Sequence, residues 1–93
     1  MIVGTLEVEL FLPGSASLKD KRAVLNRMKD RVRGRFNASI AEIGHQETWQ
    51  RARIGVAVVS HESSGCRDVL AAIQRVIESD DRVLVVDGVV DIR

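Results

Sequence analysis

The stretch Ile2–Arg22, IVGTLEVELFLPGSASLKDKR, changes its hydrophobic period at Pro13-Gly14. Before this break, apolar residues at even positions alternate with polar ones, which is the pattern of a strand with one buried face. After it, Ser17 and Asp20 have the spacing of a capping box, so we expect a helix to begin at Leu18. The start of the chain therefore predicts a strand followed closely by a helix.

Strand and helix periods continue to alternate along the rest of the chain. Gly34 is well placed to end the first helix. The later elements that we expect are a short strand around Phe36–Glu42, a strand Arg51–Ser60, a helix Cys66–Ile77 and a strand Val83–Ile92. Within the last of these, Asp87-Gly88 could form a hairpin turn, but its short flanks favour one strand with a glycine irregularity.

The resulting order, β-α-β-β-α-β, specifies a topology. Right-handed crossovers in both β-α-β halves give an antiparallel four-stranded sheet in the order 4-1-3-2. This is the α+β, ferredoxin-like sandwich, in which both helices cover one face of the sheet and the other face stays open. With 93 residues, the chain is the length of one domain with one core, so we expect a single ferredoxin-like domain over residues 1–93.

Cysteine content and hydropathy bear on location. Cys66 is the only cysteine, so no internal disulfide can form, and the N-terminus lacks the charge and apolar run of a signal peptide. No apolar segment approaches the roughly 18 residues that span a bilayer. We therefore expect a cytoplasmic protein that does not enter membranes.

Positive charge is concentrated in the first helix, although the net charge of the whole chain is only +1. At about 100° per residue, one flank of this helix collects long basic side chains and no acid. The flank consists of Lys19, Arg22, Asn26, Lys29 and Arg33. We interpret the four basic residues as a candidate nucleic-acid-binding surface, the alternative being an ordinary solvated face. Arg27 and Arg31 fall elsewhere, near Asp20 and Asp30, and are expected to be paired surface charges.

A second candidate lies where the first helix begins and the second strand ends. Its members are Lys21, Glu42, Gln46, Trp49 and Arg51. Lys21 points into the apolar sector of its helix, and because a buried ammonium needs a partner, we expect it to pair with Glu42. The alternative is that these two charges line a polar notch beneath Trp49. For Trp49 itself, burial over the end of the core is favoured over exposure to a partner.

Catalytic and metal-binding constellations are not evident. His45 and His61 should lie at opposite ends of the sheet, and Cys66 falls on the apolar face of its helix, so neither a metal site nor a Cys-His pair is expected. His45 with Glu47 could form an acid-base pair, but both belong to a loop with no burial signal. We therefore predict no metal, no cofactor and no enzymatic activity, with an enzyme acting through the Lys21 edge as the least favoured reading.

The open sheet face offers an interaction surface. Phe11 and Val59 should be its apolar members, with Val83 and Val85 as further candidates, and Glu7 and Glu9 should neutralise Arg51 and Arg53 on the adjacent strand. One aromatic is too few for stacking RNA bases, so an RNA-recognition-motif function is disfavoured. The loop after the first strand lacks an arginine, so an acylphosphatase is disfavoured too.

Three stretches together resemble one known family. They are Ser17-Leu18-Lys19-Asp20-Lys21-Arg22, Arg35–Glu42, and Trp49-Gln50-Arg51-Ala52 with the following Gly55–Ser60. They are similar to the bacterial YlxP-like proteins over essentially the whole chain, with Asp20 where that family often has glutamate. The resemblance implies a ferredoxin-like fold and no established activity. In many bacteria the family's genes neighbour those of ribosome-binding factor A and translation initiation factors, which implies a role near the ribosome.

Two hypotheses of function follow for this sequence. The first is a non-enzymatic RNA- or ribosome-associated factor that contacts phosphates through Lys19, Arg22, Lys29 and Arg33. The second is an interaction or homodimerisation module that acts through the open sheet face.

Overall fold

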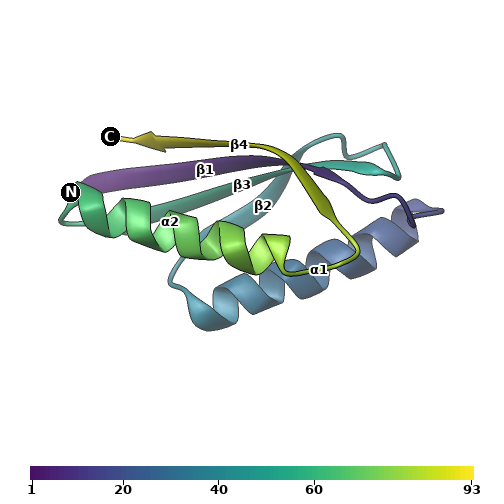
Figure 1. The fold of residues 1–93 in the computed structure, drawn as a ribbon, viewed down its shortest axis with the longest axis horizontal. Coiled ribbons are helices and arrows are strands. Elements are labelled where there is room, and N and C mark those ends of the chain that lie inside the picture. The colour runs from purple at the N-terminus through teal and green to yellow at the C-terminus, as the bar shows by residue number, and fades with distance from the viewer.

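The computed structural model, which describes all 93 residues, contains two helices and four strands in the expected order (Figure 1). The elements are β1 (Ile2–Phe11), α1 (Leu18–Arg35), β2 (Ser39–Gly44), β3 (Arg51–Ser60), α2 (Ser63–Glu78) and β4 (Leu84–Ile92). The strands form one antiparallel sheet in the order β2-β3-β1-β4, with both helices on one side. The predicted ferredoxin-like sandwich, including its strand order, is confirmed.

The start of α1 matches the sequence signal, whereas its end differs by a small shift. The Ser17 hydroxyl accepts a hydrogen bond from the Asp20 amide, and the Asp20 carboxylate accepts one from Ala16, both at 3.0 Å. The helix does not end at Gly34, which has no positive φ, but continues to Arg35. Phe36 then caps it in an extended conformation, which delays the start of β2 to Ser39.

The last strand is continuous, as expected, and its irregularity is a bulge. Asp87 lies opposite Glu9, while Val85 lies opposite the next residue, Leu10, so Val86 has no partner on β1. Gly88 pairs regularly with Val8. The bulge bends the start of β4 away from the line of β1.

The core fills the space between the sheet and the helix layer. It consists of 17 buried apolar residues, among them Cys66, which is fully buried as predicted. The alternation of β1 omits an apolar side chain at Gly4 because α2 approaches closely there. A Cβ atom at Gly4 would lie 3.0 Å from both Cys66 Cβ and Leu70 Cδ1.

Candidate functional site

Lys21 forms the buried ion pair that its helical position predicts. Its side chain is 1% exposed, and its Nζ lies 2.8 Å from Oε2 of Glu42, whose side chain is 18% exposed. Glu42 Oε2 makes no hydrogen bond of good geometry, so the contact is chiefly electrostatic. Because the ammonium has almost no exposed surface, this pair is a structural element and not an open notch for a ligand.

The ammonium of Lys21 also holds the loop between β2 and β3. It donates to the carbonyl oxygens of His45 at 2.8 Å, Arg51 at 3.2 Å and Gln46 at 3.4 Å. His45 is the only non-glycine residue of the chain with a positive φ, 61°. The sequence alone could not identify these three acceptors, because every residue has a backbone carbonyl and only the fold decides which ones meet the ammonium.

The same loop is tied to the segment before α1. The Leu12 amide donates to the Gln50 carbonyl at 2.9 Å, and Gln50 Nε2 donates to the carbonyls of Pro13 and Ser15, each at 3.3 Å. The loop is therefore held from both sides, at the end of the molecule where α1 begins (Figure 1).

Trp49 does not close the core, and the expectation that it is buried is wrong. It is 53% exposed, whereas Leu12 is 1% exposed. Leu12 and the stem of Lys21 fill the end of the core beneath the loop. The hydrogen bonds made by Gln50, the residue after Trp49, hold the loop backbone across this end of the core. The indole of Trp49 is left in solvent.

A charge cluster lies on the open sheet face at the same end. Arg53 Nε lies 3.1 Å from Glu7 Oε1, and Arg53 Nη1 lies 3.2 Å from Glu9 Oε1. Glu9 Oε2 contacts His45 Nε2 at 2.9 Å and Arg51 Nη1 at 3.7 Å. A hydrogen bond to Glu7, and a smaller contribution from the one to Glu9, raise the pKa of Arg53 above its ordinary value. The predicted cross-strand neutralisation is confirmed, and His45 contacts Glu9, not Glu47.

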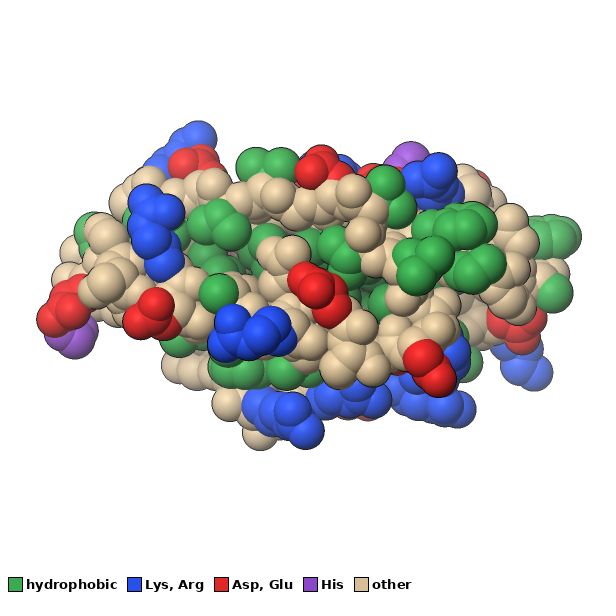
Figure 2. All heavy atoms as spheres, in the orientation of Figure 1, with side chains coloured by type: hydrophobic (Ala, Val, Ile, Leu, Met, Phe, Trp, Pro, Cys, Tyr) green, Lys and Arg blue, Asp and Glu red, His purple; other side chains and the backbone are tan.

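The basic flank of α1 lies on the side of the helix next to β2. Arg33 Nη2 donates to the Ile40 carbonyl of β2 at 3.1 Å. Lys19, Arg22 and Arg33 are exposed, Lys29 is half-buried, and none of the four forms an ion pair within 4.0 Å. A row of basic side chains is visible along the lower edge of the molecule, where α1 runs (Figure 2).

The expectation that Arg27 and Arg31 are paired with nearby acids is wrong. Neither forms an ion pair with Asp20 or Asp30 within 4.0 Å, and the Asp20 carboxylate accepts a hydrogen bond from the Ala16 amide. Arg31 lies on the opposite flank of α1, where its charge contributes to lowering the pKa of Asp80, which follows α2. The main cause of that lowered pKa is Arg82, which donates to the Asp80 carboxylate through Nε at 2.9 Å and Nη2 at 2.7 Å.

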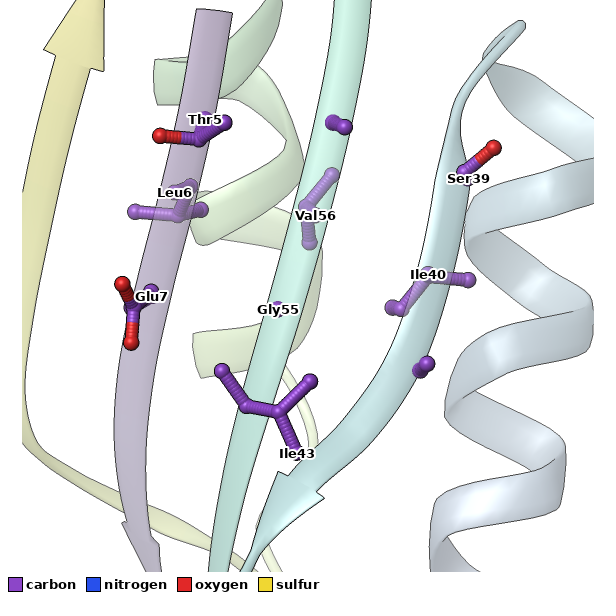
Figure 3. A pocket seen from close by; sticks show the side chains of 10 residues that line it. Thr5, Leu6, Glu7, Ser39, Ile40, Ile43, Gly55 and Val56 are labelled. Carbon is purple, nitrogen blue, oxygen red and sulfur yellow. The ribbon is translucent and has the colours of Figure 1, made fainter.

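The open sheet face contains a shallow groove with a volume of about 340 Å³ (Figure 3). Gly55 and Ala57 of β3 form its floor, Thr5 and Glu7 of β1 lie on one side, and β2 lies on the other. The expectation that Val83 and Val85 belong to this face is wrong. Val83 is 4% exposed, and Val85 packs against the core opposite Leu10. Leu84 and Val89 take their place, because they pair with Phe11 and Glu7.

Two further observations concern classes of site. The structure has no group of three or more His, Cys, Asp or Glu side chains that could hold a metal ion. Neither helix combines the length and apolar character required to cross a bilayer.

Similar folds occur among solved structures of low sequence identity. A de novo designed protein with a ferredoxin fold, LFR1 1, superposes with a TM-score of 0.60 at 14% identity, over 100% of this chain and 84% of that one. A C-terminal segment of the alpha subunit of aIF2 from Pyrococcus abyssi gives a TM-score of 0.50 at 18% identity, over 97% and 49% of the two chains. At these identities the similarity concerns the fold alone.

Sequence comparison shows the family. The model of the family described as "Protein of unknown function (DUF503)" matches residues 3–89. The uncharacterized protein YlxP of Bacillus subtilis (strain 168) is 51% identical over 59 residues, which span 63% of this chain and 64% of that protein, slightly under two thirds of its length. The resemblance to YlxP-like proteins is thereby confirmed, and the chain belongs to the DUF503 family.

Proposed function

We propose that this protein binds structured RNA, without catalysis, through the phosphates that Lys19, Arg22, Lys29 and Arg33 can reach. The observation that carries the proposal is that these four side chains share one flank of α1 and that no carboxylate neutralises any of them. Unpaired basic side chains attract a polyanion locally even when the net charge of the chain is only +1.

The dimensions of the flank suit a backbone contact. Lys19 and Arg33 are 14 residues apart, which corresponds to roughly 21 Å along a helix that rises about 1.5 Å per residue. A straight row of cations of this length can follow the phosphates of a duplex without reading its bases. The hydrogen bond from Arg33 to Ile40 fixes one end of the row against β2.

The open sheet face does not support the other common mode of RNA binding in this fold. Recognition by stacking requires several exposed aromatic rings on the sheet. Phe11 is the only aromatic there, it is half-buried, and the guanidinium of Arg51 lies over its ring at 5.6 Å from the centroid. We therefore propose recognition of RNA shape, with ribosomal RNA as the first candidate because of the gene neighbourhood that the YlxP-like resemblance implies.

The experiment measures the affinity of the protein for an A-form RNA duplex as a function of salt. Lys19→Ala, Arg22→Ala and Lys29→Ala should each weaken binding, and each should reduce the slope of log affinity against log salt by about 0.7 to 0.9. Duplexes of different sequence should be affected equally. Arg33→Ala should act in the same direction, but its thermal stability must be measured as well because Arg33 also holds β2.

Arg31→Ala is the matched control, since it removes the same kind of charge from the opposite flank of the same helix. It should leave the affinity and the slope nearly unchanged. If Arg31→Ala weakens binding as much as Arg22→Ala does, or if the unmodified protein does not bind duplex RNA at physiological salt, the flank is only a solvated surface.

A further inference from the structure

The part of the open sheet face between residues 55–59 of β3 and residues 39–43 of β2 exposes apolar side chains, while Arg51 and Arg53 lie farther along β3. Val59 is 63% exposed and Ile43 is 47% exposed, and the alanines Ala41 and Ala57 of the same face are exposed as well. Between them lies the groove of about 340 Å³ (Figure 3). A contiguous apolar area of this kind on a small protein indicates an interaction site.

Val59, which protrudes from the face, and Gly55, which lines the groove, are both on β3 at equal distances from Ala57. Val59 is two residues beyond Ala57, and Gly55 is two residues before it, so each is about 7 Å from Ala57 along β3. Gly55 has no side chain of its own, and the side chain of Ile43 from β2 lies over it: its Cδ1 and Cγ2 would each be 3.1 Å from a Cβ atom at Gly55. The surface therefore has apolar contacts, Val59 on one side of Ala57 and Ile43 over Gly55 on the other, at the matching distances that a two-fold interface requires.

The two charges nearest this area are already partnered within the chain, whereas Asp87 of β4, opposite Glu9, forms no ion pair. Glu7 at the groove wall is bound by Arg53, and Arg93 Nε lies 2.9 Å from Asp91 Oδ2 at the other side of the face. Desolvating such pairs strands no single charge, in contrast to burying a lone carboxylate or guanidinium. The surface therefore requires neither an acidic nor a basic partner, which favours a second copy of the same chain.

We propose that this face is the interface of a homodimer in which two sheets pack face to face about a two-fold axis that passes near Ala57. Rotation about an axis that crosses β3 at Ala57 places Val59 of each copy over Gly55 of the other, against Ile43. Residue 57 then meets its own counterpart. Closed two-fold interfaces of this isologous kind are the commonest in homo-oligomers.

The available area limits the size of the interface. Three strands of nine or ten residues and the six-residue β2, about 4.8 Å apart and about 3.3 Å per residue, cover roughly 550 Å² per partner, or about 1,100 Å² in total. This is just below the usual range of about 1,200–2,000 Å² for specific interfaces. The dimer is therefore expected to be reversible and to dissociate on dilution.

The test is sedimentation equilibrium of the full chain at concentrations from about 10 to 500 µM, which suit an interface of this size. The unmodified protein should pass from monomer to dimer across this range. Ala57→Glu should be monomeric throughout, because two carboxylates would meet at the axis. Ala57→Lys should also be monomeric, and an equimolar mixture of the two variants should associate again, because opposite charges then meet.

Ala71→Glu is the control, since it makes the same change at an exposed position of α2, on the other side of the molecule, and it should dimerise as the unmodified protein does. Val59→Asp is a second interface variant, away from the axis, that should be monomeric. The proposal is overturned if the unmodified protein stays monomeric at about 500 µM, the highest concentration of the series. It is equally overturned if Ala57→Glu still dimerises, or if the mixture of Ala57→Glu and Ala57→Lys remains monomeric.

Discussion

Replacing Lys21 by methionine tests whether the buried ammonium is the main support of the loop between β2 and β3. Methionine preserves most of the apolar stem but removes the donor to Glu42 and to three carbonyl oxygens. Removing one partner of a buried ion pair typically costs about 3–5 kcal/mol. We expect the free energy of unfolding to fall by about this amount, because loss of the ammonium also leaves the loop carbonyls without a donor.

This cost is large for a chain of 93 residues, whose total stability is expected to be about 5–14 kcal/mol. Because 1 kcal/mol shifts the Tm of such a domain by about 4–8 °C, the Tm should fall by roughly 12–40 °C. Urea denaturation followed by circular dichroism, together with calorimetry, measures both quantities. Lys19→Met, an exposed lysine in the same turn of α1, is the control and should change the stability by no more than about 0.5 kcal/mol.

Glu42→Gln separates the ion pair from the loop contacts. If Glu42 were the only partner of Lys21, its removal would be the more damaging change, because it would leave a buried positive charge. The three carbonyls still solvate the ammonium in Glu42→Gln, so we expect a loss of only about 1–2 kcal/mol. The reasoning is refuted if Lys21→Met is no less stable than Lys19→Met, or if Lys21→Met combined with Glu42→Leu regains full stability, since the carbonyls remain unpaired in that variant.

Two further predictions concern stability. Arg82 lowers the pKa of Asp80 below its ordinary value of 3.8, so the stabilisation is present above about pH 4 and is lost as the pH falls through the lowered pKa. Asp80→Asn should cost about 1–2 kcal/mol at neutral pH, a figure reduced for the partial exposure of Arg82, and should flatten the acid limb of the stability profile. Gly4→Ala should cost about 1–3 kcal/mol in urea denaturation, because the new methyl group would lie 3.0 Å from Cys66 Cβ; Gly14→Ala, where no atom lies within 4 Å, is its control.

The fold was predictable because the periods of β1, α1 and β3 each agree with the buried set that the structure shows. Boundaries were less accurate where tertiary contacts decide them. Phe36 has strand-like alternation with its neighbours, yet it caps α1, and its side chain packs against the core from that position. Likewise Val85 reads as an outward residue of a regular strand, but the bulge at Val86 turns it inward opposite Leu10.

The candidate site was predictable only where the position of a residue on its helix or strand left one possible environment for the side chain. The position of Lys21 on the apolar sector of α1 required a buried partner, and Glu42 was the acid on the matching register. Trp49 had no such constraint. Its exposure depends on hydrogen bonds of the Gln50 backbone and amide, which residue type does not encode.

The two proposed surfaces lie on different sides of the molecule, and this arrangement limits how they can act together. The basic flank belongs to the helix layer, and the dimer interface belongs to the opposite face of the sheet (Figure 1). Stacking helix, sheet, sheet and helix places the two α1 helices of a dimer about 30 Å apart, with their basic flanks separated by both sheets. Each flank lies on the β2 side of its helix, and the proposed axis places β2 of one copy over β2 of the other, so both flanks face the same edge of the dimer. An RNA that spans this distance along that edge would contact both flanks, and a monomeric Ala57→Glu variant should keep the salt dependence of a single flank while losing the gain in affinity that such an RNA provides.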